Sequence, residues 1–195
     1  VIVMTSHRIT IGLPGGGGRM GGMLIREIAR ADDLHLVAAT DRVDSPHIGQ
    51  DAGGMAGVGS NGVVLGVDPA QLFTDADVVI DFTAPEASLQ HAALAAETGT
   101  AMVIGTTGLT PDQEELLRQA GKKSAIVYCA NTSVGVTLLT QLVEQIAAKL
   151  TTGWDIEILE THHHHKVDAP SGTALALGKA AARGRQVDLD SVADM

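Results

Sequence analysis

A run of glycines between an apolar strand and an amphipathic helix is the feature that most limits the folds open to this chain. Residues 8–11 have the character of a short strand, and four consecutive glycines begin at Gly15. Apolar residues then recur at helical spacing over residues 20–28. The frame Gly15-x-x-Gly18-x-x-Gly21 gives the tight turn and close backbone approach that bind the pyrophosphate of a dinucleotide. The sequence therefore predicts the start of a parallel α/β sheet with a dinucleotide site.

The next expected strand supports this interpretation. It covers residues 34–39 and is followed by Thr40, Asp41 and Arg42. An acidic residue at this place accepts hydrogen bonds from ribose hydroxyls, and an arginine beside it can bind a 2′-phosphate. Asp41 and Arg42 therefore predict a site for NADH or NADPH without choosing between the two cofactors.

The same alternation of strands and helices continues to residue 129. A glycine-rich, weakly periodic stretch over residues 45–61 interrupts it and is expected to be a mobile surface loop. Continuous apolar strands between amphipathic helices are typical of a doubly wound parallel sheet. Further strands are expected over residues 63–67, 78–82, 101–104 and 125–129, and helices over 69–73, 85–98 and 111–120.

Polar residues and glycines follow several of these strands directly. Phe82 and Thr83 follow one strand, Gly105 begins the turn after the next, and Asn131 lies beyond the last. Because ligands of such sheets bind at the carboxyl ends of the strands, we expect these residues at the nicotinamide end of the cofactor. Taken singly, each is more often a turn residue.

A longer helix is expected over residues 134–150, with Leu138, Leu142 and Ile146 on one apolar stripe. It links the cofactor-binding part to the segment that carries the histidines. Trp154 is expected to pack at that junction.

The last residues of the chain contribute less to the prediction. Residues 180–195 are polar and charged with little periodicity, and they complete no second domain. We place a dinucleotide-binding domain at residues 1–131 and part of a substrate-binding and oligomerisation domain at residues 132–195.

The densest chemistry lies in residues 160–173. Four consecutive histidines, residues 162–165, and Lys166 follow an expected strand over residues 155–158. Ser171 precedes an apolar helical run and is predicted to be its N-cap. A helix start attracts a carboxylate or a phosphate. The segment therefore predicts a site that binds an anion and moves protons.

Two other interpretations of the histidine run are weaker. Expression tags lie at chain termini, whereas this run has ordered-looking sequence on both sides. A zinc site needs converging ligands, but neighbouring side chains of an extended chain point to opposite faces, and a spaced second pair is missing. We therefore expect no metal site.

Composition argues against several other classes of protein. The formal net charge of −10 disfavours binding to a nucleic-acid backbone, and an aromatic fraction of 2% disfavours a base-stacking surface. A single cysteine, Cys129, allows no internal disulfide and fits a reducing compartment. No apolar run reaches membrane-spanning length. We expect a cytoplasmic protein that binds neither nucleic acid nor membrane.

Taken together, the motifs resemble the bacterial dihydrodipicolinate reductase family, also called 4-hydroxy-tetrahydrodipicolinate reductase. The resemblance implies that NADH or NADPH reduces a cyclic dicarboxylate to tetrahydrodipicolinate, in the diaminopimelate route to lysine. It also implies a homotetramer. The motifs that carry it are Gly18-Arg19-Met20-Gly21, Asp81-Phe82-Thr83, Gly105-Thr106-Thr107-Gly108, Asn131-x-Ser133-x-Gly135 and the segment from His162 to Thr173.

The resemblance also implies roles for single residues. His162 is the implied acid/base residue, and Lys166 is the implied proton donor that also meets the substrate's negative charge. His163, Gly172 and Thr173 are implied to bind the substrate. With Phe82 added from its place after a strand, the expected cofactor residues are Gly15, Gly16, Gly17, Gly18, Arg19, Met20, Asp41, Arg42, Phe82, Gly105, Thr106, Thr107, Ala130, Asn131, Thr132 and Ser133.

The expected fold class is therefore α/β: a doubly wound, Rossmann-like parallel sheet with a second, α+β substrate domain. Family members continue beyond residue 195, so we expect the second domain to be incomplete in this sequence. The alternative function from another class is a non-catalytic NAD(P)-binding, redox-sensing module.

Overall fold

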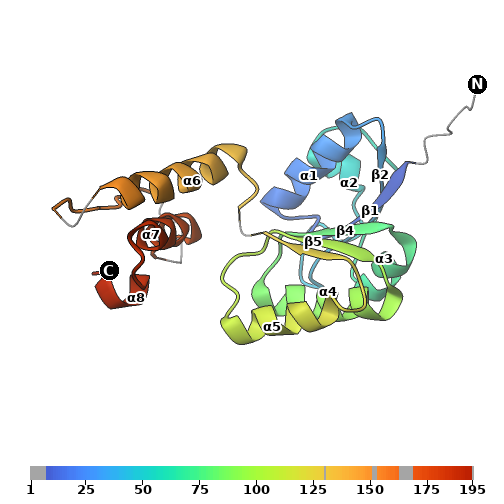
Figure 1. The fold of residues 1–195 in the computed structure, drawn as a ribbon. Coiled ribbons are helices and arrows are strands. Elements are labelled where there is room, and N and C mark those ends of the chain that lie inside the picture. Colours follow the sequence, from blue (N-terminus) through green and yellow to red (C-terminus); the bar gives the residue numbers. More distant parts are fainter. Residues whose placement is uncertain (1–7, 130, 151–152, 163–168, 195) are drawn as a thin grey trace, which may run out of the picture. The chain divides into compact units, whose positions relative to one another are not determined.

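The computed structural model describes residues 8–129, 131–150, 153–162 and 169–194 (Figure 1). The chain separates into two compact units, Val1–Cys129 and Ala130–Met195.

A six-stranded parallel sheet forms the centre of the first unit. Its strand order, β3-β2-β1-β4-β5-β6, confirms the doubly wound α/β fold. The order reverses between β1 and β4, and such a reversal opens a ligand-binding crevice at the carboxyl ends of the strands. The strands are β1 Ile9–Pro14, β2 Leu34–Thr40, β3 Leu65–Gly66, β4 Val78–Asp81, β5 Ala101–Ile104 and β6 Ile126–Tyr128.

Helices cover both faces of this sheet, with α1 and α2 on one face and α4 and α5 on the other (Figure 1). Proline stands in the first turn of α3, α4 and α5, where its missing N–H costs no helical hydrogen bond. One apolar cluster packs beneath α1 and α2, and a second packs beneath α3, α4 and α5. The helices are α1 Arg19–Arg30, α2 Ala52–Ala56, α3 Pro69–Asp75, α4 Pro85–Thr98 and α5 Pro111–Ala120.

The expectation of a mobile loop over residues 45–61 is wrong. This stretch contains α2, whose Ala52 is fully buried. Asp51 caps the helix by accepting the Gly54 N–H at 2.7 Å, and it also accepts the Ser60 hydroxyl at 2.8 Å. These hydrogen bonds, first that of Gly54, lower the pKa of Asp51 to about 2. Packing and capping therefore order a stretch whose alanines and glycines show no periodicity.

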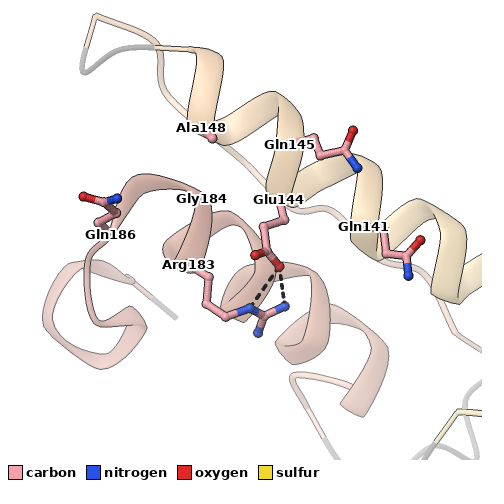
Figure 2. A pocket seen from close by; sticks show the side chains of 7 residues that line it. All are labelled: Gln141, Glu144, Gln145, Ala148, Arg183, Gly184 and Gln186. Carbon is pink, nitrogen blue, oxygen red and sulfur yellow. Dashed lines mark hydrogen bonds and ion pairs between the residues drawn. The ribbon is translucent and has the colours of Figure 1, made fainter.

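The second unit contains helices α6 Val134–Lys149, α7 Gly172–Arg185 and α8 Leu189–Val192. Helices α6 and α7 approach closely at Gly184, where a Cβ atom would lie 2.3 Å from the Glu144 carbonyl oxygen. Figure 2 shows Arg183 of α7 reaching the Glu144 carboxylate of α6, with Nη2 at 2.9 Å and Nε at 3.0 Å. An open hollow of about 430 Å³ lies beside this ion pair, and no predicted site residue lines it.

One prediction for the second unit is wrong. Residues 155–158 form no strand, because a strand needs a hydrogen-bonded partner and the described part of this unit supplies none. Trp154 is 60% exposed, and its packing at the junction of the two units stays a prediction. Residues 180–195, for which the sequence predicted no element, are largely helical, since α7 runs on to Arg185 and α8 follows. The buried alanines at 180–182 favour a helix without producing an amphipathic pattern.

Candidate active site

The glycine turn between β1 and α1 has the shape that a pyrophosphate needs. Gly15 has a φ of +72°, and the Gly18 N–H donates to its carbonyl oxygen at 3.0 Å. At Gly21 a Cβ atom would lie 2.4 Å from that same oxygen, so only glycine lets α1 start so close to the turn. The N-cap of α1 is Gly18, which has no side chain with which to cap the helix. Its first N–H groups therefore suit a phosphate, and the residues present fit a dinucleotide.

Asp41, predicted to accept hydrogen bonds from the ribose, lies against this turn. Its Oδ2 is 2.3 Å from the point where a Cβ of Gly17 would be. The Ser45 hydroxyl donates to Oδ2 at 3.1 Å, and the Arg42 N–H donates to Oδ1 at 2.8 Å. The Arg42 side chain is exposed, with Nε 3.7 Å from Asp44 Oδ1. The carboxylate is therefore held in place, whereas the guanidinium lies in solvent.

The turns after β4 and β5 form a second part of the site. The Phe82 ring lies on Gly105, where a Cβ atom would come within 2.1 Å of it. The Gly105 N–H donates to the Asp81 carbonyl oxygen at 2.8 Å and joins the two turns. Thr107 is exposed, but Thr106 is buried and its hydroxyl accepts a hydrogen bond from Ser88 at 2.7 Å. Of these two threonines, only Thr107 is accessible from solvent.

Sequence reasoning assigned no role to a buried polar cluster behind these turns. Asp81 is fully buried, and its Oδ2 lies 2.8 Å from Nδ1 of His91. Burial opposes ionisation of Asp81, but hydrogen bonds from His91 and Thr83 outweigh it and hold the pKa below its ordinary value. Ser88 and His91 are polar residues on the buried face of α4, a signal that the sequence already contained.

Asn131, Thr132 and Ser133 lie at the start of α6 in the second unit. The Ser133 hydroxyl caps the helix by accepting the Val136 N–H at 3.3 Å, and Asn131 Oδ1 accepts the Ser133 N–H at 3.0 Å. Thr132 is exposed. Ala130 is outside the described residues. The described contacts of Asn131 and Ser133 therefore set the beginning of α6.

A carboxylate that sequence reasoning left without a role connects the histidine segment to α7. Glu160 Oε2 lies 2.8 Å from Nε2 of His162, and its Oε1 accepts the Ser171 N–H at 2.8 Å. Hydrogen bonds from Ser171, followed by that of His162, lower the pKa of Glu160 to about 2. The acid two residues before the histidine run was the available sequence signal. His163 and Lys166 are outside the described residues.

Ser171 caps α7 as predicted, by accepting the Ala174 N–H at 3.1 Å. Gly172 and Thr173, two of the predicted substrate residues, occupy the first turn of this helix. Backbone N–H groups in a first turn have no partner within the helix and can meet a carboxylate.

The described residues contain neither a cluster of metal ligands nor a membrane-spanning helix. Over residues 8–129, 131–150, 153–162 and 169–194, no three His, Cys, Asp or Glu side chains come together as metal ligands. Within the same ranges, the helices are too short or too polar to cross a lipid bilayer.

Two family models match the chain in succession. The model for the N-terminus of dihydrodipicolinate reductase matches residues 9–132, and the model for its C-terminus matches residues 135–193. Together they cover the glycine turn and the histidine segment.

Individual relatives agree with the family models. The 4-hydroxy-tetrahydrodipicolinate reductase of Ruegeria pomeroyi is 50% identical over 189 residues, which are 97% of this chain and 70% of that protein. The enzyme of the same name from Nitrosomonas eutropha is 46% identical over 95% of this chain and 69% of its own length. A dipicolinate-bound dihydrodipicolinate reductase from Paenisporosarcina sp. TG-14 superposes with a TM-score of 0.71 at 28% identity, over 91% of this chain and 67% of that one. The chain belongs to the dihydrodipicolinate reductase family.

Proposed function

We propose that this chain performs the reaction for which its relatives are named. A hydride from NADH or NADPH reduces 4-hydroxy-tetrahydrodipicolinate, or the dihydrodipicolinate formed from it, to tetrahydrodipicolinate in the diaminopimelate route to lysine. The observation that carries this proposal is the 50% identity to the Ruegeria pomeroyi reductase over nearly the whole chain. That identity extends through both units.

The cofactor belongs to the first unit in this proposal. The turn from Gly15 to Gly18 and the start of α1 bind the pyrophosphate, and Asp41 accepts hydrogen bonds from the adenosine ribose. Phe82 and Gly105 form the wall for the nicotinamide. When bound, the dinucleotide supplies the hydride.

His162 is the acid/base residue in this proposal, and Glu160 fixes the orientation of its ring through Nε2. The ionised Glu160 carboxylate accepts a hydrogen bond from Nε2 of His162, so the neutral imidazole carries its proton there. Nδ1 then remains to exchange a proton with the substrate. Lys166 donates a proton and meets the substrate's negative charge, and His163 contributes to substrate binding; both roles rest on the family resemblance.

The substrate site is proposed at the start of α7. A cyclic dicarboxylate is a dianion, and the N–H groups of Gly172 and Thr173 offer one carboxylate the positive end of a helix. The reductase from Paenisporosarcina was solved with dipicolinate, a ligand of this chemical class.

The domain boundaries stay as proposed from the sequence, with a dinucleotide-binding domain at residues 1–131 and part of a substrate-binding and oligomerisation domain at 132–195. The unit boundary after Cys129 and the family-model boundary between residues 132 and 135 support this division. A cytoplasmic location and a homotetramer remain proposals.

A steady-state assay of cofactor oxidation with enzymatically generated substrate tests the function. We expect turnover by the chain and a fall in kcat of about 100-fold or more in His162→Gln and in Lys166→Ala, because each substitution removes a proton-transfer group. Unchanged turnover in both variants would refute the assigned roles. Binding of NADH without oxidation by any dicarboxylate would favour a redox-sensing module instead.

A further inference from the structure

The buried carboxylate of Asp81 is hydrogen-bonded on both of its oxygens. Oδ2 contacts Nδ1 of His91 at 2.8 Å, while Oδ1 accepts the N–H of Thr83 at 2.8 Å and its hydroxyl at 2.6 Å. His91 lies on α4, and its ring packs against that of Phe73 with centroids 6.0 Å apart. The carboxylate at the end of β4 is thus hydrogen-bonded both to helix α4 and to the turn that follows the strand.

A hydroxyl pair extends this cluster to the neighbouring turn. Ser88, one helical turn before His91 on α4, is fully buried and donates to the Thr106 hydroxyl at 2.7 Å. The Ser88 and Thr83 hydroxyls are 3.5 Å apart. Helix α4 therefore holds the turn after β4 through His91 and Asp81, and the turn after β5 through Ser88.

Thr83 also reaches the phosphate-binding turn. Its Cγ2 atom lies 2.9 Å from the point where a Cβ of Gly15 would be. The hydroxyl of Thr83 is thus fixed on Asp81 while its methyl group contacts the first glycine of the turn. Three loops of the proposed cofactor site, after β1, β4 and β5, rest on one buried polar cluster.

We propose that Asp81, His91 and Ser88 are positioning residues that hold the nicotinamide end of the cofactor site in its binding geometry. A buried charged group is a poor means of stabilising a core, because well-packed apolar side chains do as well without the desolvation cost. What the cluster supplies is a fixed direction for Thr83 and Thr106, and through them for Phe82 and Gly105. The inference rests on the proposed binding of NADH or NADPH.

The test compares two ligands on the full chain by titration calorimetry: NADH, and ADP-ribose, which lacks the nicotinamide. His91→Leu removes the donor to Asp81, whereas His91→Asn keeps an N–H donor near the Nδ1 position. We expect His91→Leu to weaken NADH binding about fivefold to tenfold more than ADP-ribose binding, and His91→Asn to restore most of the difference. Ser88→Ala, a smaller change, should shift the ratio in the same direction.

A matched control tests for mere loss of stability. Thr100 donates a buried hydrogen bond to the Phe73 carbonyl oxygen at the amino end of β5, away from the cofactor turns. Thr100→Val should lower the melting temperature and leave the ratio of the two dissociation constants unchanged.

The possible outcomes separate this inference from the proposed function. Equal weakening of NADH and ADP-ribose in His91→Leu and Ser88→Ala, or no rescue by asparagine, overturns the positioning role and leaves the reductase proposal standing. Failure of the unmodified chain to bind either NADH or NADPH overturns both.

Discussion

The two units differ in how they bury their apolar side chains. In the first unit, β1 places Leu13 completely inside, between the sheet and its helices. In the second unit, Leu138, Leu142 and Ile146 form the predicted stripe on α6, yet each is more than half exposed. An amphipathic pattern therefore identifies the face that a helix offers for packing, but only the surrounding structure decides whether that face is covered.

The largest expected effect sharpens this contrast directly. Leu13→Ala should lower the free energy of unfolding by about 3 kcal/mol or more, because it leaves a cavity in a closed core. Leu142→Ala, on the half-exposed stripe, should cost less than about 1 kcal/mol. Urea unfolding followed by circular dichroism measures both. Equal decreases in the free energy of unfolding would contradict the contrast between the two units. A decrease for Leu142→Ala that grows with protein concentration would show that another copy covers α6.

A smaller effect is expected at low pH, at a loop-organising carboxylate in each unit. Glu160 in the second unit and Asp51 in the first both have a pKa lowered to about 2, from 4.5 and 3.8. The stabilisation by each carboxylate is therefore complete above its ordinary pKa, 4.5 for Glu160 and 3.8 for Asp51, and is lost as the pH falls through about 2. The amide resonances of Ser171 and Gly54, which donate to these carboxylates, should report it.

Substitution provides the control for this titration. Glu160→Gln should abolish the acid transition at Ser171 and leave that at Gly54 intact. A Ser171 amide that titrates near pH 4.5 would mean that its contact with Glu160 does not form in solution.

The smallest effect concerns exposed ion pairs, which should be alike in both units. Arg183 forms an ion pair with Glu144 in the second unit, and Arg118 forms one with Glu115 in the first. The side chains of both pairs are largely exposed to solvent. Arg183→Met and Arg118→Met should each cost about 0.5 kcal/mol, and less in high salt. Thermal unfolding at two salt concentrations checks this. A clearly larger loss for Arg183→Met would show that this pair, unlike Arg118, fixes the packing of α6 on α7.

Local sequence signals made the boundaries of several elements predictable to the exact residue. Helix α4 is confirmed at 85–98 because Pro85 marks its first turn and Gly99, with a φ of +79°, ends it. The glycine frame and Asp41 were predictable for the same reason, since the turn and the strand end carry their own chemistry. The roles of the cofactor and substrate residues stay predictions until they are measured.

Elements that depend on distant partners were not predictable. Helix α2 has no periodicity and exists through burial and the Asp51 cap. Apolar and polar residues alternate over 155–158 as in a strand. A strand forms only where a neighbouring strand accepts and donates its backbone hydrogen bonds, and the segment's own sequence does not show whether such a neighbour exists. The contact between Asp81 and His91 joins a strand to the second turn of a helix, so only the folded chain shows that the two side chains meet.

The contact between Gly17 and Asp41 limits attempts to redesign cofactor preference. Because the Asp41 carboxylate fills the space that a Cβ at position 17 would need, a side chain at position 17 requires a change at position 41. A longer acid at 41 needs the bare backbone at 17, and any side chain at 17 expels the acid. Libraries aimed at cofactor exchange would therefore fare better at Arg42 and Ser45, which border the carboxylate without competing for its volume.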